Sequence, residues 1–244
     1  MGLLKVKHEN LKIGTIVKPK RRKLTPTPRP IVAAVITTPD RQMYLGPLLE
    51  RLTPLCQEVR IFNDVHKWGH RYNYGRALKV MCREWHQEEG LDVQFTAGKH
   101  MPILVCTDDM ITVPDWLQRW QAIHEEAERS IYCLFSRKRS VFTPENIARG
   151  YHVGTPARGF YDAATIFINQ PYLPWQADDW FEREGRHKMT AQRAKHWDVI
   201  LQEYLIDQGK EWVTCTPSLF EHVGKISTMQ HKIGGATVYV GNTL

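Results

Sequence analysis

Two runs of consecutive apolar residues constrain the fold of this chain more than any other feature. They are IVAAVITT, which begins at Ile31, and MPILVC, which begins at Met101. A strand with one face in water alternates apolar and polar residues, whereas an unbroken apolar run is typical of a strand covered on both faces. Sheets covered on both faces carry helices on each side and are mostly parallel. We therefore predict an α/β fold.

Four segments have the spacing of apolar residues that is expected of helices. They span residues 44–55, 75–89, 115–129 and 197–205, and short β-branched or aromatic runs predict further strands at 59–65, 131–135, 163–168 and 212–215. Residues 143–162 are rich in Gly, Pro and aromatic side chains and are predicted to form a loop. Strands and helices that alternate in this way predict a mostly parallel central sheet with flanking helices, in a single domain.

The first thirty residues have a different character from the rest. They end in KPKRRKLTPTPRP, residues 18–30, where basic side chains precede prolines that remove backbone donors and favour an extended chain. We therefore divide the sequence into a basic, proline-containing arm at 1–30 and a folded domain at 31–244. The arm either contacts phosphate groups or is a solvated tail, and the sequence leaves both interpretations open.

The charge balance favours an anionic partner. Lys and Arg total 33 against 26 Asp and Glu, a formal net charge of +7, which suits nucleic acid, a membrane surface or a phosphate-bearing substrate, or simply keeps the protein soluble. No apolar run approaches the ~20 residues that a membrane-spanning helix needs. The five cysteines are scattered and never spaced as CxxC, which is typical of reduced core thiols. We expect a cytoplasmic protein without a transmembrane segment; the sequence does not indicate an oligomeric state.

Acidic residues follow the predicted strands at the points where those strands end. Asp64 follows one strand, and Asp108 and Asp109 follow another. Ligands of α/β sheets bind beyond the carboxyl ends of the strands. Adjacent carboxylates repel each other unless hydrogen bonds or a cation compensate, and Mg²⁺ or Mn²⁺ suits oxygen ligands. The alternatives are local: Asp108 or Asp109 caps the following turn, and Asp64 forms an Asx turn.

The order of these motifs resembles the GT-A glycosyltransferases. The matching segments are TTPDR, the strand ending in Asp64, GHRYNYGRAL, the strand ending in TDD, GFYDAATIFI and PSLFEHVGKIS, which together cover most of 31–227. The acidic motif departs from the family pattern because it reads Thr-Asp-Asp in place of Asp-x-Asp. The resemblance implies a Rossmann-like GT-A fold and a hexosyltransferase-like enzyme that uses Mn²⁺ or Mg²⁺ and a nucleotide-sugar donor, with a UDP-sugar expected.

The resemblance also implies roles for single residues. Asp109 and His222 would bind the metal, and Asp108 would contact the ribose, or the metal through water. The base and ribose of the nucleotide would lie against the residues at the ends of the first two strands, which are Thr37, Thr38, Arg41 and Asp64. Arg76 would face the diphosphate. The alternatives are an ordinary satisfied histidine for His222 and a solvated helix charge for Arg76.

Transfer with inversion needs a carboxylate that takes the proton of the acceptor hydroxyl. Asp178, Asp179 and Asp198 are the candidates. Asp198 is preferred because it opens the helix before the last motif, as an acidic residue does in related inverting enzymes, whereas Asp179 lies on a predicted acceptor loop. Both could equally be helix-starting or solvated carboxylates, and a retaining enzyme would need no such base.

The acceptor is the least constrained part of the prediction. Positive charge concentrated in 18–23 and 67–76 favours nucleic acid, and the acceptor hypothesis is a hydroxymethylated base in DNA of the kind that bacteriophages glycosylate, in the host cytoplasm if the protein is viral. Trp68, Tyr72 and Tyr74 could stack at the gap left by a flipped base, or pack in the core. The alternatives are a glycosyltransferase of a surface glycan or lipid-linked acceptor, and a non-enzymatic nucleic-acid-binding protein. A sugar nucleotidyltransferase is disfavoured because the first loop, TTPDRQ, lacks glycines.

Overall fold

The computed structural model describes residues 31–88, 102–137, 139–154, 164–168 and 172–223. The predicted arm at 1–30 lies outside the described residues, as do 159–162 and 224–227, which hold parts of two of the quoted motifs. The division of the sequence at residue 31 therefore stays a prediction.

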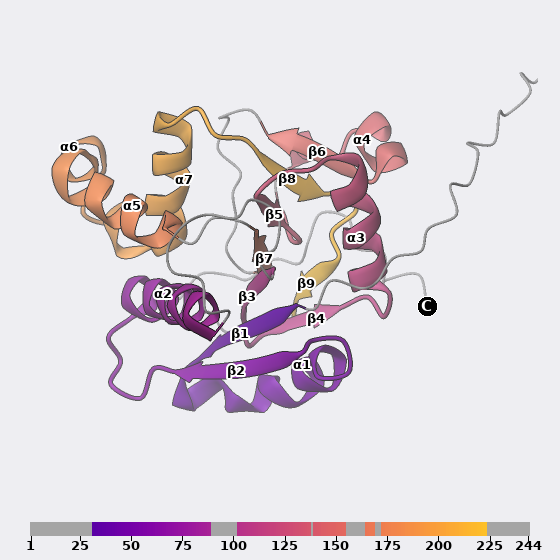
Figure 1. The fold of residues 1–244 in the computed structure, drawn as a ribbon, viewed down its shortest axis with the longest axis horizontal. Coiled ribbons are helices and arrows are strands. Elements are labelled where there is room, and N and C mark those ends of the chain that lie inside the picture. The colour runs from indigo at the N-terminus through magenta and orange to yellow at the C-terminus, as the bar shows by residue number, and fades with distance from the viewer. Residues whose placement is uncertain (1–30, 89–101, 138, 155–163, 169–171, 224–244) are drawn as a thin grey trace, which may run out of the picture.

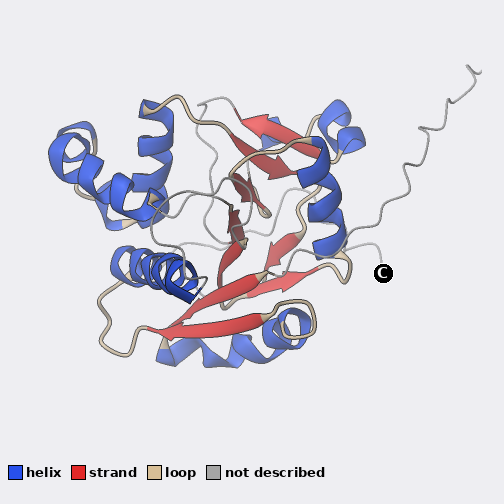
Figure 2. Cartoon of the chain, in the orientation of Figure 1, coloured by secondary structure: helices blue, strands red, loops and turns tan. Residues whose placement is uncertain are grey.

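A seven-stranded sheet runs through the middle of the described chain, in the order β2-β1-β3-β7-β5-β8-β6 (Figures 1 and 2). Its strands are β1 (Val32–Thr37), β2 (Glu58–Asn63), β3 (Ile103–Thr107), β5 (Ile131–Cys133), β6 (Tyr151–Gly154), β7 (Ala164–Phe167) and β8 (Trp212–Cys215). The pairings make five strands run in one direction, while β6 and β7 run in the other. The predicted α/β fold with a mostly parallel sheet is confirmed.

Helices cover both faces of this sheet (Figure 1). They are α1 (Leu45–Leu52), α2 (His70–Glu88), α3 (Trp116–Glu126), α4 (Pro144–Arg149), α5 (Leu173–Trp180), α6 (Arg186–Lys188) and α7 (Trp197–Asp207). Short 3-10 turns precede α1, α4 and α7, and a π-helical turn, Phe181–Gly185, joins α5 to α6. Within the described ranges, no helix is long and apolar enough to cross a membrane.

Strand β1 divides the interior into two cores. Ala33 and Val35 face a core that includes side chains of α1 and α3, whereas Val32 and Ala34 face a core that includes side chains of α2, α5 and α7. This alternation has the period of two expected of a strand, and all six residues of β1 are buried. The unbroken apolar run therefore does what was predicted of it, since each neighbour in the run packs on a different layer of helices.

Two segments that were predicted to be loops contain regular structure. The segment predicted as a loop at 143–162 contains α4 and β6, because the Thr143 side chain caps the helix by accepting from Asn146 N at 3.2 Å, and Gly150 ends it at φ 95°. Asp179, predicted on an acceptor loop, lies in α5. Both helices are short, so they carry too few periodic apolar residues to stand out in the sequence.

Candidate functional site

The site begins where three parallel strands end side by side. Thr37, the last residue of β1, is in register with Asn63 of β2, and its neighbour Ile36 is in register with Thr107 of β3. The ladder extends one residue further on each side, because Asp64 N donates to Thr37 O at 2.9 Å and Asp108 N donates to Ile36 O at 3.0 Å. The backbone thus fixes both aspartates beside the end of β1, as the sheet topology predicts.

A cavity of about 270 Å³, which we call the acidic cavity, opens at this edge. Its lining includes most of the residues predicted to contact the nucleotide, namely Thr37, Thr38, Arg41, Asp64 and Asp108. Lys67 and Asn73 also line it, and sequence reasoning did not assign them to the site. Lys67 has a left-handed backbone conformation, with φ 54°, which a lysine in the sequence does not predict. Asn73 is held in place by its side-chain amide, which donates to Phe62 O at 3.1 Å.

Arg41 compensates the two buried carboxylates of the acidic motif. Its Nη2 atom lies 2.9 Å from Asp108 Oδ1 and also forms an ion pair with Asp109. The Asp108 carboxylate accepts a further hydrogen bond from Thr37 Oγ1 at 2.6 Å. Asp108 and Asp109 are almost completely buried, so their charges need such partners. In this structure Arg41 therefore stabilises the acidic pair, a contact that the predicted nucleotide-binding role did not include.

Burial raises the pKa of Asp108 to about 6. The hydrogen bond from Thr37 and the charge of Arg41 lower this pKa, while the neighbouring charge of Asp109 raises it. Groups that raise the pKa of Asp108 and groups that lower it thus act on the same carboxyl. Such perturbed pKa values are typical of functional sites in clefts and also occur in structural ion-pair networks.

A second, two-stranded sheet brings His222 to Asp109. It pairs β4 (Met110–Thr112) with β9 (Phe220–His222) antiparallel, with Met110 in register with His222. Val223 N donates to Asp109 O at 2.8 Å, and His222 Nε2 lies 3.3 Å from Asp109 Oδ2. The two residues predicted to bind the metal are therefore neighbours in space, although they come from distant parts of the sequence.

The donor set fits a divalent cation that takes its other ligands from elsewhere. Within the described part of the chain, no group of three or more His, Cys, Asp or Glu side chains is placed to hold a metal. Asp109 Oδ1, however, is buried and has no hydrogen-bond partner among the described residues. Mg²⁺ and similar ions are commonly held by one or two carboxylates together with substrate phosphates and water. An ion here would share Asp109 with Arg41 or displace the guanidinium from it.

Asp64 has a structural role as well as a place in the cavity. Its Oδ1 accepts from Trp68 N at 2.9 Å and its Oδ2 accepts from Gly69 N at 2.8 Å. These bonds fold the loop 64–69 back over the end of β2 and correspond to the local, turn-forming alternative.

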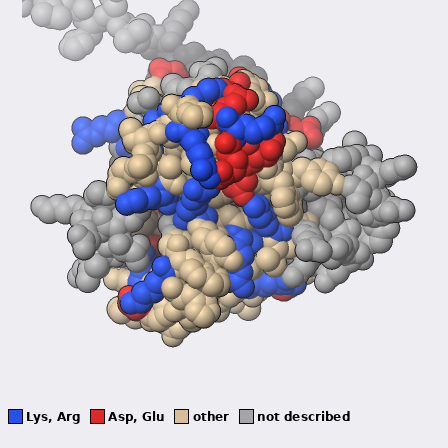
Figure 3. Space-filling view, turned by 90° about the vertical axis from the view of Figure 1, so that its left-hand side faces the viewer, with Lys and Arg blue, Asp and Glu red and all other residues tan. Residues whose placement is uncertain are grey.

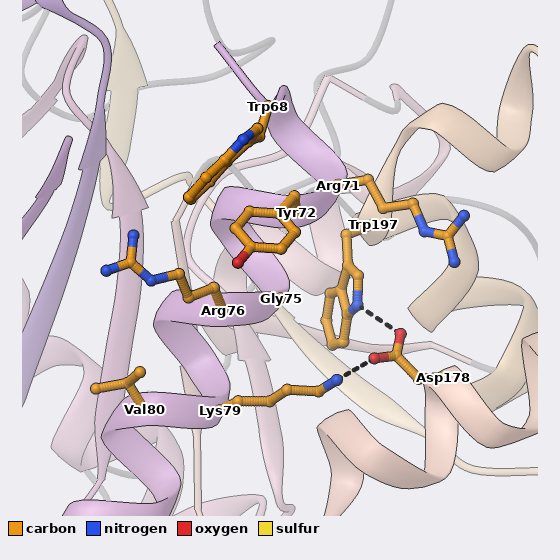
Figure 4. A pocket seen from close by; sticks show the side chains of 9 residues that line it. All are labelled: Trp68, Arg71, Tyr72, Gly75, Arg76, Lys79, Val80, Asp178 and Trp197. Atoms are coloured by element: carbon orange, nitrogen blue, oxygen red, sulfur yellow. Dashed lines mark hydrogen bonds and ion pairs between the residues drawn. The ribbon is translucent and has the colours of Figure 1, made fainter. Parts of the chain in front are cut away.

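A second cavity of about 530 Å³, which we call the aromatic cavity, lies along α2 (Figure 4). Its lining residues include Trp68, Arg71, Tyr72, Arg76, Lys79, Asp178 and Trp197. Arg76, predicted to face the diphosphate, is placed here and not with the residues of the acidic cavity. The Asp178 carboxylate accepts from Trp197 Nε1 at 3.2 Å and forms an ion pair with Lys79.

Of the three candidate bases, Asp178 lines the aromatic cavity, whereas Asp179 and Asp198 line neither of the two cavities. Asp198 is half-buried in the first turn of α7, next to Trp197 of the aromatic cavity. The Asp179 side chain is 62% exposed and forms an ion pair with Arg183 one helical turn away. Asp198 is therefore a half-buried sequence neighbour of a cavity-lining residue, while Asp179 has the surroundings of a surface helix charge.

Comparisons with known proteins give a weak structural similarity and no related sequence. No protein-family model matches the chain. A search of curated proteins finds no relative. Among solved structures, the chain is similar to a glycosyltransferase involved in the glycosylation of the major capsid of PBCV-1, with 10% sequence identity and a TM-score of 0.44, over 80% of this chain and 94% of that one. A similarity at this level does not define an activity for this chain.

Proposed function

We propose that this protein is a GT-A type glycosyltransferase whose nucleotide-sugar donor binds in the acidic cavity. One observation carries the proposal: two adjacent buried carboxylates at the carboxyl end of β3 lie beside a histidine that a separate strand pairing brings to them. The cavity next to them opens at the carboxyl edge of a mostly parallel sheet, where nucleotide ligands of α/β folds bind. A buried charge cluster is costly to maintain for stability alone, which supports a functional reason for it.

The residues that line the acidic cavity and those that lie next to it divide into two groups in this proposal. Thr37, Thr38 and Asp64 would contact the base and ribose of a UDP-sugar, since hydroxyl and carboxylate oxygens accept from or donate to these groups. Asp109 and His222 would hold Mn²⁺ or Mg²⁺, with Asp108 joined through water. The ion, when bound, would supply positive charge to the departing diphosphate.

The transfer step needs a base on the acceptor side. The glycosidic bond between the sugar and the diphosphate breaks, a new bond forms from the acceptor oxygen to the same carbon, and the acceptor proton passes to a carboxylate. We propose Asp198 for this role in an inverting reaction, because it lies in the first turn of α7 and follows Trp197, a residue that lines the aromatic cavity. Asp179 is the second candidate.

For the acceptor we propose a hydroxymethylated base in DNA, with the enzyme in the cytoplasm of a cell, which would be the host cell if the protein is viral. A lipid-linked or surface-glycan acceptor needs the same donor site and is the alternative within the same function. A purely nucleic-acid-binding protein is a weaker alternative, because it gives no role to the buried pair Asp108 and Asp109 or to His222 beside it.

The proposal is tested by the binding of UDP together with Mn²⁺, followed by thermal unfolding and by calorimetric titration. A ligand that binds only the folded protein raises its melting temperature by mass action. We expect Asp109→Asn to abolish the increase and His222→Ala to weaken it. The matched control is Asp115→Asn, since Asp115 is an exposed carboxylate paired with Arg119 outside the site. An unchanged affinity for UDP and Mn²⁺ in both site variants would rule out this assignment of the metal ligands.

A further inference from the structure

The aromatic cavity lies outside the proposed donor site, and it presents two large rings to solvent. Trp68 is 53% exposed and Tyr72 is 50% exposed, and their rings meet edge to face with centroids 4.5 Å apart. Tyr74 is different because it is completely buried and stacks on Trp197 at 5.4 Å. Exposed aromatic side chains that line a cavity are costly to hydrate and are typical of binding surfaces for flat ligands.

The cavity also holds a cation that no described residue compensates. Arg76 is exposed and forms no hydrogen bond or ion pair with any residue that the structure describes. Lys79 is different because Asp178 compensates its charge. Arg71 lies over the ring of Phe181 at 4.3 Å, with Glu182 3.5 Å away, and Figure 4 shows its guanidinium turned to the opposite side from that of Arg76. The lining therefore combines two exposed rings with one uncompensated positive charge.

This combination selects for a particular chemistry in the ligand. A neutral sugar would pack on the rings but would gain little from the guanidinium. A nucleotide uses both features, because its base stacks on aromatic rings and its phosphate accepts hydrogen bonds from arginine. The face of the molecule that carries α2, α5 and α6 has Lys and Arg side chains spread over its centre, beside a cluster of acidic ones (Figure 3). A nucleotide fits the cavity better than a neutral glycan does.

The position of the cavity relates it to the acidic cavity. Both are lined by one short segment, 67–76, whose residues face them in turn: Lys67, Gly69 and Asn73 line the acidic cavity, and Trp68, Tyr72 and Arg76 line the aromatic one. The two cavities therefore share this segment as a border.

We propose that the aromatic cavity is the acceptor site and that it binds one nucleotide of a nucleic-acid strand. The base packs against Trp68 and Tyr72, and a strand phosphate pairs with Arg76. The role as acceptor site rests on the proposed glycosyltransferase function, whereas the binding of a strand nucleotide can be measured without any transfer reaction.

The test is the binding of a fluorescein-labelled, single-stranded oligothymidylate to the full chain, measured by fluorescence anisotropy over a range of salt concentrations. The double variant Trp68→Ala/Tyr72→Ala should bind at least about fivefold more weakly, the loss expected when base stacking is removed. Its control is Trp175→Ala, a partly exposed tryptophan of α5 outside the cavity. Arg76→Ala should lower the slope of log affinity against log salt by about 0.7, the value for one phosphate contact on a single strand. Arg51→Ala, on α1, should leave the slope unchanged.

A local measurement separates this cavity from other basic parts of the chain. An oligonucleotide containing iodouracil should form photo-cross-links that map to Trp68 or Tyr72. Failure of this inference is distinguishable from failure of the donor proposal: Asp109→Asn should lose the effect of UDP and Mn²⁺ on melting while it keeps the strand, and the double aromatic variant should do the reverse.

Three results would overturn the inference. The first is equal strand affinity in the double variant and the unsubstituted protein, together with cross-links that map elsewhere. The second is displacement of the strand by free UDP at concentrations that saturate the donor site, which would assign the aromatic cavity to the donor nucleotide. The third is binding of a neutral oligosaccharide that the double variant loses and that salt does not affect, which would assign the cavity to a glycan.

Discussion

The two cavities beside the segment 67–76 differ in whether a charged side chain is buried and paired or, like Arg76 among the described residues, exposed and unpaired. In the acidic cavity the carboxylates of Asp108 and Asp109 are buried, and Arg41 pairs with both of them. In the aromatic cavity Arg76 stays exposed and uncompensated within the described structure, and two rings lie open to solvent. The charge cluster at the acidic cavity is thus paired before any ligand binds. In the aromatic cavity, a ligand would itself cover the exposed charge and the exposed apolar surface.

This difference separates two ways of building a binding site. A buried cluster is rigid and selective, but it adds to the energetic demands on folding because each charge must find a partner. An exposed cluster places little demand on folding and binds with a strength that depends on salt. Substitutions of equivalent residues in the two cavities should therefore have very different consequences, and the predictions below proceed from the largest expected effect to the smallest.

The largest difference should be seen on removing one arginine from each cavity. Arg41→Ala leaves two buried carboxylates without their cation and should lower the free energy of unfolding by about 3 kcal/mol, the range found for broken buried ion pairs. Arg76→Ala should change it by less than about 0.5 kcal/mol, as for other exposed positions. Urea unfolding of both variants measures the contrast. Equal losses of stability would show that burial of the acidic pair does not require Arg41.

The next effect concerns turnover. Asp198→Asn should lower the rate of transfer by about two orders of magnitude while the affinity for the donor stays the same, because only proton removal from the acceptor is lost. Asp179→Asn is the matched control, since that carboxylate is exposed and paired with Arg183. If Asp179→Asn alone gives the loss, the two roles must be exchanged.

A smaller effect is expected at the floor of the aromatic cavity. A Cβ atom at Gly75 would lie 2.9 Å from Nε1 of Trp197, which is buried, stacked on Tyr74 and bonded to Asp178 and so has little room to move. Gly75→Ala should therefore cost about 2 kcal/mol of stability through overpacking. Gly46→Ala in α1, where nothing lies within 4 Å, should be neutral or slightly stabilising. Thermal unfolding compares the two, and a stable Gly75→Ala protein would mean that α2 and α7 pack less tightly than described.

The smallest effect should come from the wall that the two cavities share. Asp64→Asn keeps one acceptor oxygen but cannot accept from both Trp68 N and Gly69 N, so it should cost about 1 kcal/mol. Because the loop touches both cavities, the variant should weaken the binding of UDP and of the oligonucleotide together. Weakening of one ligand alone would show that the loop serves only that cavity.

Much of the fold could be predicted from local sequence signals. Strands β1 and β3 are marked by apolar runs, and β8 was located at its observed bounds because WVTC is short, β-branched and aromatic. Helix α2 begins five residues earlier than predicted, since its first turn carries polar residues that lack the apolar period. α5 was not predicted as a helix because its eight residues make only about two turns, too few for the period of its apolar side chains to stand out.

The candidate site could be predicted only in part. Asp64, Asp108 and Asp109 could be placed together because the topology of parallel strands puts their ends at one edge. The pairing of Arg41 with Asp108 and Asp109, and the position of Arg76 in a separate cavity, depend on how loops and helix faces turn in three dimensions. Tyr74 and Tyr72 illustrate the same limit: they are two positions apart, yet one is buried and the other exposed.

The pairing of β4 with β9 is a contact between distant parts of the sequence, which slows its formation during folding. It joins Met110 to His222, roughly 110 positions apart, so a very large loop must close before the ladder forms. During synthesis the carboxylates of the acidic motif leave the ribosome long before the histidine is made. We therefore expect the proposed binding of a metal–nucleotide complex to be gained late in folding, so that recovery of binding lags behind recovery of tryptophan fluorescence when the protein refolds. A ligand that binds only when β4 and β9 are paired would then stabilise the fully folded protein over forms in which this pairing is still open.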